Sequence, residues 1–203
     1  MKTQAYNKDW TKPWWSVGYQ NKKQAGFDAL DAYLSTPPKT ILDIGCGMAW
    51  ESRKFTEKYN TELWLIDGDV ESNNNKDIAR SNYGKWHETP DTMMFYHSLN
   101  YIKEKLDESG IKNYHLINTN NIQIPADTKF DLITSWLSCG FHYPVSSYRD
   151  LILKHSHKHT MICMDLRLTK QSINRMPVLE HGVELVKVIH TGQKHVHGHI
   201  KFV

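Results

Sequence analysis

Short runs rich in leucine and isoleucine recur along the middle of the chain, separated by longer and more polar stretches. They lie at 41–44, 63–66, 115–117, 130–133 and 161–164. Runs of this length, bounded by polar residues, are typical of strands that are buried on both faces of a sheet. The pattern therefore predicts a sheet whose strands are joined by long connections.

The stretches between these runs carry helical spacing. Helices are expected over 21–34 and 146–155, and a further one is expected to start at 89–91 and to stop at Gly110. The polar interval 70–90 predicts a loop with a short helix and no core strand. Strands that alternate with helices predict an α/β fold, a mostly parallel sheet with helices on both faces.

The end of the chain has a different pattern. Two strand-like stretches, 183–189 and 195–203, flank the sequence His-Thr-Gly-Gln and predict a β-hairpin. At 203 residues the chain is expected to form one domain with a continuous core. We divide this domain into a cap or lid at 1–37, a core at 38–166, and a C-terminal helix and hairpin at 167–203.

A glycine turn follows the first apolar run directly. Asp43 stands inside the strand, and Gly45-Cys46-Gly47 precede the expected start of a helix. Glycine allows backbone conformations and close approaches that a Cβ would block. Exposed N–H groups at the turn and the positive end of the helix dipole are expected to form a polar surface for a ligand.

Two classes of nucleotide-binding protein use such a turn. A dinucleotide turn needs a third glycine at the position that Trp50 occupies here, whereas a shorter form of the turn accepts Ala49. The second run is followed by Asp67, and a carboxylate at the tip of a second strand can accept hydrogen bonds from both hydroxyls of a ribose. These residues favour a nucleoside-containing ligand other than a dinucleotide.

With these residues the sequence resembles the class I S-adenosylmethionine (SAM) methyltransferases, over residues 38–166 above all. The resemblance implies a Rossmann-like fold, with a mostly parallel seven-stranded sheet that ends in an antiparallel hairpin. It also implies that the glycine turn lies under the methionine part of SAM, that Asp67 binds the ribose, and that Asn120 contacts the adenine. The family most often has Asp in place of Asn120, whose amide oxygen still accepts a hydrogen bond. The implied cofactor contacts are Asp43, Gly45, Cys46, Gly47, Asp67, Gly68, Asn120, Asn121, Ile122 and Ser135.

The loop after the fourth run, 135–144, is expected to meet the methyl acceptor, because ligands of open α/β sheets bind beyond the carboxyl ends of the strands. It lacks the Asn/Asp-Pro-Pro-Tyr/Phe motif of methyltransferases that modify amino groups of bases. His142 in this loop suits proton removal from a hydroxyl. Hydrogen bonding to the substrate and a structural role are the alternatives for His142. Substrate contacts are expected from Trp14, Trp136, Tyr143 and Arg167.

Two other groups have both a functional and a structural interpretation. Trp10, Trp14 and Trp15 either cap the sheet or form a lid over the site, where aromatic rings can face a sulfonium cation. Asp165 and Arg167, at the end of the fifth strand, either bind an anionic acceptor or pair with each other.

The sequence contains 12 histidines, several of them in alternating positions. His195, His197 and His199 share one face of the last strand, at a spacing of about 7 Å that is too wide for three ligands of one ion. We therefore expect no metal site there, and a solvated or helix-covered face. The histidines at 155–159 are placed around a helix end, where a cationic side chain interacts favourably with the dipole.

Composition excludes several classes of function. The net charge is +3 without a long Lys/Arg block, so a nucleic-acid partner is not expected. No stretch has the character of a signal peptide or a membrane span, so no membrane partner is expected. Cys46, Cys139 and Cys163 are odd in number and suit reduced thiols. We expect a cytoplasmic protein.

These features predict a SAM-dependent methyltransferase that acts on a hydroxyl group of a small polar molecule, such as a sugar or a related metabolite. The acceptor is inferred by analogy with the family, because a fold does not determine a substrate. Two alternatives stay open. One is a catalytically degenerate SAM-binding sensor or scaffold, and the other is an NAD-linked oxidoreductase, which Trp50 disfavours.

Overall fold

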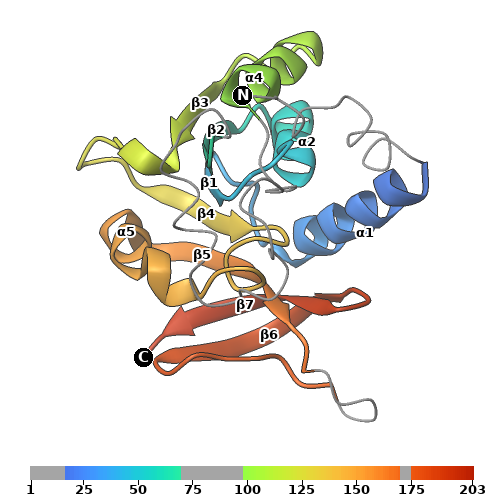
Figure 1. The fold of residues 1–203 in the computed structure, drawn as a ribbon, viewed down its shortest axis with the longest axis vertical. Helices are drawn as coiled ribbons and strands as arrows, with labels where there is room; N and C mark the ends of the chain where they lie inside the picture. The colour runs from blue at the N-terminus through green and yellow to red at the C-terminus, as the bar shows by residue number, and fades with distance from the viewer. Residues whose placement is uncertain (1–16, 70–97, 170–174) are drawn as a thin grey trace, which may run out of the picture.

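A computed structural model describes residues 17–69, 98–169 and 175–203, which contain one seven-stranded sheet in the order β3-β2-β1-β4-β5-β7-β6 (Figure 1). Neighbouring strands from β3 to β5 are parallel, and β7 is antiparallel to both β5 and β6. The strands are β1 (Thr40–Ile44), β2 (Glu62–Asp67), β3 (Tyr114–Asn118), β4 (Phe130–Ser135), β5 (Ser156–Arg167), β6 (Val183–Thr191) and β7 (His195–Phe202). The observed topology confirms the predicted fold class.

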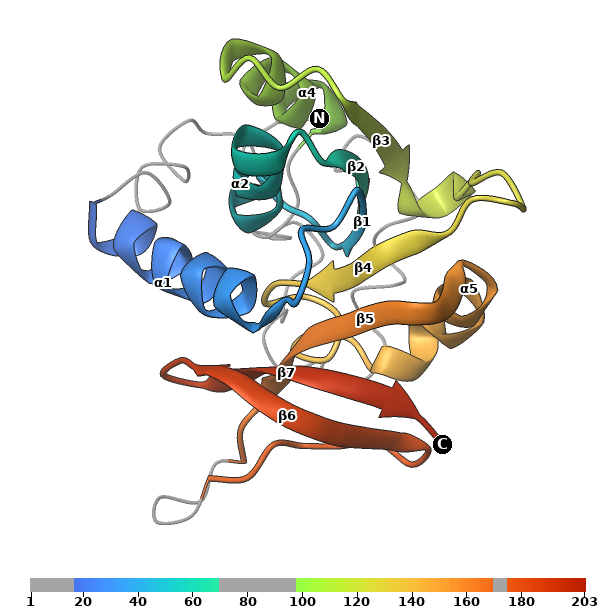
Figure 2. The same cartoon turned by 180° about the vertical axis from the view of Figure 1, so that it is seen from behind.

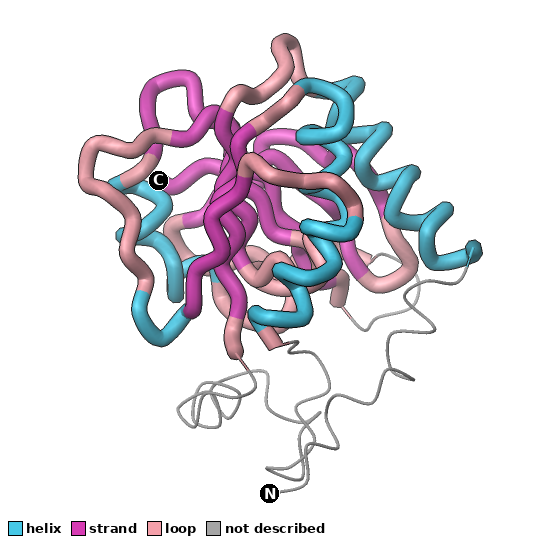
Figure 3. The backbone as a smooth tube through the Cα atoms, turned by 90° about the horizontal axis from the view of Figure 1, so that it is seen from above, coloured by secondary structure: helices cyan, strands magenta, loops and turns pink. Residues whose placement is uncertain are grey.

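Helices cover both faces of this sheet, as Figures 1 and 3 show. The described helices are α1 (Val17–Tyr33), α2 (Trp50–Tyr59), α4 (Leu99–Glu108) and α5 (Arg149–Lys154), with short 3-10 helices at Thr119–Asn121 and Val145–Tyr148. None of them has both the length and the apolar character needed to cross a membrane. Figure 2 shows α1 and α2 together on the side of the molecule opposite α5.

Two hydrophobic cores result, one on each face of the sheet. Successive strand residues point to opposite faces, so Ile41 packs in the core under α1 and α2, whereas Leu42 packs in the core that includes Ile152 of α5. Both faces of the central strands are covered, which explains why these strands read as continuous apolar runs. In α1 the buried side chains are Phe27 and Leu30, as the spacing predicted.

The predicted boundaries were wrong at two places. The helix that contains Leu106 begins at Leu99, because the Ser98 side chain accepts a hydrogen bond from the Tyr101 N–H and caps it. Its predicted start at 89–91 lies outside the described residues, as do the polar interval 70–90 and the N-terminal tryptophans. Strand β5 begins at Ser156, so His157 and His159 lie in a strand and not around a helix end.

The strand order indicates where a ligand site is expected in this sheet. The direction in which the strands are added to the sheet reverses between β1 and β4, and ligands of open α/β sheets bind beyond the carboxyl ends of the strands at such a point. The residues that follow β1, β2 and β4 therefore meet at one edge, which we call the carboxyl edge.

Candidate functional site

The glycine turn after β1 has the left-handed backbone that its sequence predicts. Gly45 and Gly47 have φ values of 70° and 51°. The N–H groups of Gly45 and Cys46 donate to the Ile66 carbonyl at 2.7 and 3.0 Å, and the Gly47 N–H donates to the Asp67 carboxylate. The turn is therefore fastened to the end of β2. Its N–H groups are engaged within the protein, contrary to the expectation that they are exposed to a ligand.

Asp67 is the partner that β2 supplies to this turn. Its Oδ2 accepts the Gly47 N–H and its Oδ1 accepts the Gly68 N–H at 2.6 Å. Burial raises the pKa of Asp67 to about 7, although both hydrogen bonds act to lower it. Each carboxylate oxygen has a second lone pair, so the side chain can still accept hydrogen bonds from ligand hydroxyls.

Asp43 provides a second buried carboxyl group on β1. It is completely buried and accepts a hydrogen bond from the Ser52 hydroxyl of α2 at 2.6 Å. Its Oδ1 has no hydrogen-bond partner among the described residues. Burial raises the pKa of Asp43 to about 8, with smaller contributions in the same direction from the charges of Glu51 and Asp67. A cationic group near Asp43 would favour its ionised form.

The first turn of α2 adds a third carboxylate, that of Glu51. It is buried and forms an ion pair with Lys23 of α1 at 2.5 Å. Burial raises the pKa of Glu51, and the Lys23 charge opposes that shift. The carboxyl edge near the glycine turn is thus rich in buried acids.

The residues expected to contact adenine lie after β3. Asn120 is exposed in the 3-10 helix, and its backbone N–H donates to the Asn118 side chain at 2.9 Å. The exposed Asn121 accepts from Gln123 at 3.2 Å, and Ile122 packs against the core on the α5 face. These three residues therefore follow the neighbouring strand at the same edge as Asp67.

Ser135 ends β4, and its hydroxyl is used to hold the chain. It donates to the Ile44 carbonyl at 2.6 Å and accepts the Cys139 N–H at 2.8 Å, and the side chain is fully buried. These bonds connect the ends of β1 and β4 and shape the loop that follows. The structure thus gives this predicted cofactor contact an evident structural role.

Trp136 begins the loop after β4 and points into the core. Its ring stacks on His197 with 3.9 Å between centroids and an angle of 2°, and it also packs close to Gly26 of α1. Only 9% of Trp136 is exposed. The predicted substrate contact therefore lies mainly inside the protein, while Trp14 lies outside the described residues.

Two of the other predicted acceptor residues, His142 and Arg167, contact the ring of Phe141 in the same loop. The His142 ring packs edge-on against Phe141 at 4.8 Å, and the Arg167 guanidinium lies 4.6 Å from the centre of the Phe141 ring. The N–H groups of His142 and Tyr143 both donate to the Ser138 carbonyl. The structure therefore brings His142 and Arg167 together at Phe141, and Tyr143 follows His142 in the same loop.

Sequence reasoning missed the groups that surround Asp165. The Asp165 carboxylate accepts hydrogen bonds from the Leu137 N–H and from His197, both at 2.8 Å. The sequence predicted a solvated or helix-covered face for these histidines; His197 is completely buried, so the solvated alternative was wrong for this residue. His199 instead contacts Tyr33 of α1 at 3.0 Å. The alternation was visible in the sequence, but the pairing of β7 with β5 was needed to find the partner.

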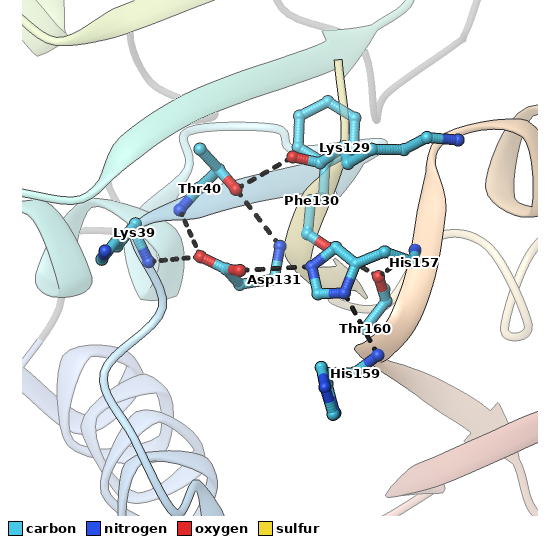
Figure 4. Close-up of polar contacts among 8 residues, drawn as sticks. All are labelled: Lys39, Thr40, Lys129, Phe130, Asp131, His157, His159 and Thr160. Atoms are coloured by element: carbon cyan, nitrogen blue, oxygen red, sulfur yellow. Dashed lines mark hydrogen bonds and ion pairs between the residues drawn. The ribbon is translucent and has the colours of Figure 1, made fainter. Parts of the chain in front are cut away.

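A separate polar network lies at the opposite edge, where β1, β4 and β5 begin (Figure 4). Asp131 accepts hydrogen bonds from the N–H groups of Lys39 and Thr40 at 2.7 and 3.2 Å, and His157 contacts its other oxygen at 3.3 Å. The His159 N–H donates to the His157 ring at 3.1 Å. This network joins three strand starts, and we assign these histidines a structural role.

Potential metal ligands and the cysteines were predicted to be without a metal site and without disulfides. Among the residues described, no group of three or more His, Cys, Asp or Glu side chains could hold a metal ion. Cys46, Cys139 and Cys163 are all buried free thiols, as the odd number of cysteines predicted.

Comparison with known proteins relates the chain to others by structure alone. No protein-family model and no curated protein matches the sequence. A SAM-dependent methyltransferase from Aquifex aeolicus has a TM-score of 0.56 at 15% identity, covering 91% of this chain and 98% of that one. The ribosomal protein L11 methylase from Lactobacillus delbrueckii subsp. bulgaricus has a TM-score of 0.55 at 12% identity, covering 91% and 79%. The plantazolicin methyltransferase BpumL, solved with SAH, has a TM-score of 0.51 at 15% identity, covering 79% and 51%. The chain therefore has the fold of the class I methyltransferases.

Proposed function

We propose that this protein is a SAM-dependent methyltransferase that methylates a hydroxyl group of a small polar molecule, such as a sugar or a related metabolite. SAM would supply an electrophilic methyl group on a sulfonium centre. The structural neighbours are named as methyltransferases, and this agreement supports the reaction class at the level of the fold.

The observation that carries the proposal is the pair of buried carboxyl groups beside the glycine turn. Asp43 and Asp67 are buried beside it with raised pKa values, and Asp43 has an oxygen without a described partner. A ligand with positive charge and hydroxyl donors would compensate such groups, because both features favour ionised carboxylates. The sulfonium, ammonium and ribose hydroxyls of SAM provide them.

The same observation argues against a dinucleotide. A pyrophosphate needs free N–H donors and tolerates few nearby acids. Here the N–H groups of residues 45–47 are engaged by the end of β2, and Trp50 stands where the third glycine of a dinucleotide turn is needed. We therefore expect weak binding of NAD at most.

The acceptor would lie beside the loop 136–144, which follows β4 directly. His142 and Arg167 both contact the Phe141 ring there, and together with Tyr143 of the same loop they offer hydrogen-bond donors and acceptors. A hydroxyl acceptor must lose its proton during or after methyl transfer, so the site needs a base nearby. Two histidines contact the Phe141 ring of this loop: His142, which the sequence predicts for this role, and His195 of β7.

A SAM-binding sensor without catalytic activity is the second candidate, supported by Asn120 in place of the acid that the family most often carries. Transfer of tritium from methyl-labelled SAM to a panel of sugars, polyols and phenols distinguishes the two. Labelled product from any of these, lost in Asp67→Ala, supports the enzyme. SAM binding in calorimetry without transfer to any member of the panel supports the sensor.

A further inference from the structure

A buried carboxylate between two histidines lies next to the acceptor loop. Asp165 lies in the buried part of β5, and its Oδ1 accepts a hydrogen bond from Nδ1–H of His197 at 2.8 Å. On the other side, Nε2 of His195 lies 3.6 Å from Oδ2. Both histidines belong to β7, which pairs Asp165 with His197 and Arg167 with His195. The group therefore depends on the antiparallel pairing of β5 and β7.

Two hydrogen bonds fix the position of the Asp165 carboxylate. Besides the His197 contact, Oδ2 accepts the N–H of Leu137, whose φ of 53° turns the start of the acceptor loop toward β5. His197 is itself clamped by its stacking on Trp136. A carboxylate held by this many groups needs little rearrangement when a charge develops beside it, which is how preorganised sites stabilise transition states.

His195 connects this carboxylate with the loop. His195 lies two residue pairs nearer the carboxyl edge than His197 in the pairing of β5 with β7. Its side chain is 19% exposed, whereas that of His197 is completely buried. Its ring packs edge-on against Phe141, at 6.0 Å between centroids. Figures 1 and 2 both show the β6–β7 turn, the loop after β4 and α1 on the same side of the molecule.

Burial and the surrounding charges together set the pKa of His195. Burial lowers its pKa, and the charge of Asp165 opposes that shift. The charges of His197 on the same strand, Lys23 on α1 and His190 on β6 act in the same direction as burial. His195 is therefore neutral at neutral pH, which is the form that accepts a proton.

We propose that His195 is the general base of the methyl transfer, with Asp165 and His197 as positioning residues; this inference rests on the proposed function. The acceptor oxygen attacks the methyl carbon, the carbon–sulfur bond breaks with its electron pair going to sulfur, and the acceptor proton passes to Nδ1 of His195. Nδ1 takes the proton because Nε2 faces the carboxylate. Asp165 then stabilises the imidazolium that forms.

The test uses the wild-type protein with SAM and its demethylated product SAH, and needs no acceptor. Reacting atoms lie about 3 Å apart, and a base lies about 3 Å from the proton donor, so a base serving the acceptor lies within roughly 8 Å of the sulfonium. The positive charge of SAM, absent from SAH, should lower the pKa of His195 by about 0.4 to 1.5. Histidine ring signals followed by NMR during a pH titration measure this difference, and the His195→Gln variant assigns the signal.

Each outcome decides the inference. The control is His115, which lies on β3 and contacts Glu62 of the neighbouring strand β2. The inference is supported if the difference between the SAM and SAH titrations is clearly larger at His195 than at His115. Equal shifts at both histidines overturn it, although the proposed function stands if the Gly45 and Gly47 amide signals respond to SAM. No response at these amides overturns both. Asp165→Asn should lower the pKa of His195 further, and an unchanged value means that the carboxylate does not assist it.

Discussion

Replacing Asp43 by asparagine should change the pH dependence of folding stability in a defined way. In the folded protein Asp43 is completely buried with a pKa raised to about 8, whereas in an unfolded chain Asp titrates near 3.9. Between these values the folded state holds a proton that the unfolded state has released. Stability from this group is therefore fully present at low pH and is lost as the pH rises toward 8. The amide side chain of the Asp43→Asn variant cannot ionise, so the variant should lack this loss.

The magnitude follows from proton linkage. One extra proton bound in the folded state changes the free energy of unfolding by about 1.4 kcal/mol per pH unit. Between pH 5 and 7.5 the wild type should lose about 3 kcal/mol relative to Asp43→Asn, and the difference should level off above about pH 8.5. Asp67 and Glu51 titrate in both proteins, so their contributions largely cancel in the difference.

Urea unfolding followed by circular dichroism at half-unit pH steps measures this difference. Ser52→Ala is the matched control, because the Ser52 hydroxyl bond acts to lower the pKa of Asp43. In Ser52→Ala this hydrogen bond is missing, so the loss of stability from Asp43 should continue to a higher pH than in the wild type. A difference between wild type and Asp43→Asn that stays flat from pH 5 to 9 would mean that the pKa of Asp43 is not raised in the folded protein, and would refute the argument that this buried carboxyl group needs a cationic ligand.

Other predictions concern the cofactor and the turn. Asp67→Ala should weaken SAM binding about ten- to a hundredfold in calorimetry, since hydrogen bonds to a charged acceptor are worth about 1.5–3 kcal/mol; unchanged affinity places the ribose elsewhere. SAM should bind wild type about tenfold more tightly at pH 8 than at pH 6, because Asp67 titrates near pH 7 and the ionised form is the better acceptor; affinity independent of pH contradicts this. Gly45→Ala should destabilise folding by about 3 kcal/mol or more in urea, against about 1–2 for Gly47→Ala, because a Cβ at Gly45 would lie 1.9 Å from Ser138 Oγ whereas nothing lies within 4 Å at Gly47; equal costs refute the packing argument. His142→Ala should leave SAM affinity within about twofold and should lower turnover less than His195→Gln, which should lose about 10²–10⁴-fold as the variant without the proposed base; a larger loss in His142→Ala would assign the base to His142.

The sheet could be predicted from the sequence because its signals are local. Each central strand is a short apolar run, and Gly45, Gly47 and Asp67 stand where a turn and a strand end require them. The strand bounds differ from the predicted ones by few residues, except at β5. There His157 and His159 gave a polar start to the strand, and only the pairing of Phe130 with Ser156 shows that it begins so early.

The environments of individual side chains could not be predicted in the same way. Whether His197 is buried depends on Asp165, 32 residues away, and on the stacking of Trp136. The turn N–H groups looked available for a ligand because the sequence does not say that Ile66 and Asp67 engage them. Long-range pairing, which brings these groups together, has no periodic signal in the chain.

Binding of SAM measured beside binding of NAD tests the central claim most directly. Titration calorimetry of the wild-type protein at pH 8 with SAM, SAH, NAD and NADP needs no knowledge of the acceptor. We predict saturable binding of SAM and SAH, weakened in Asp67→Ala, and no detectable heat with NAD or NADP. Tight binding of NAD together with none of SAM would contradict the claim that the acidic glycine-turn site is built for a cationic nucleoside.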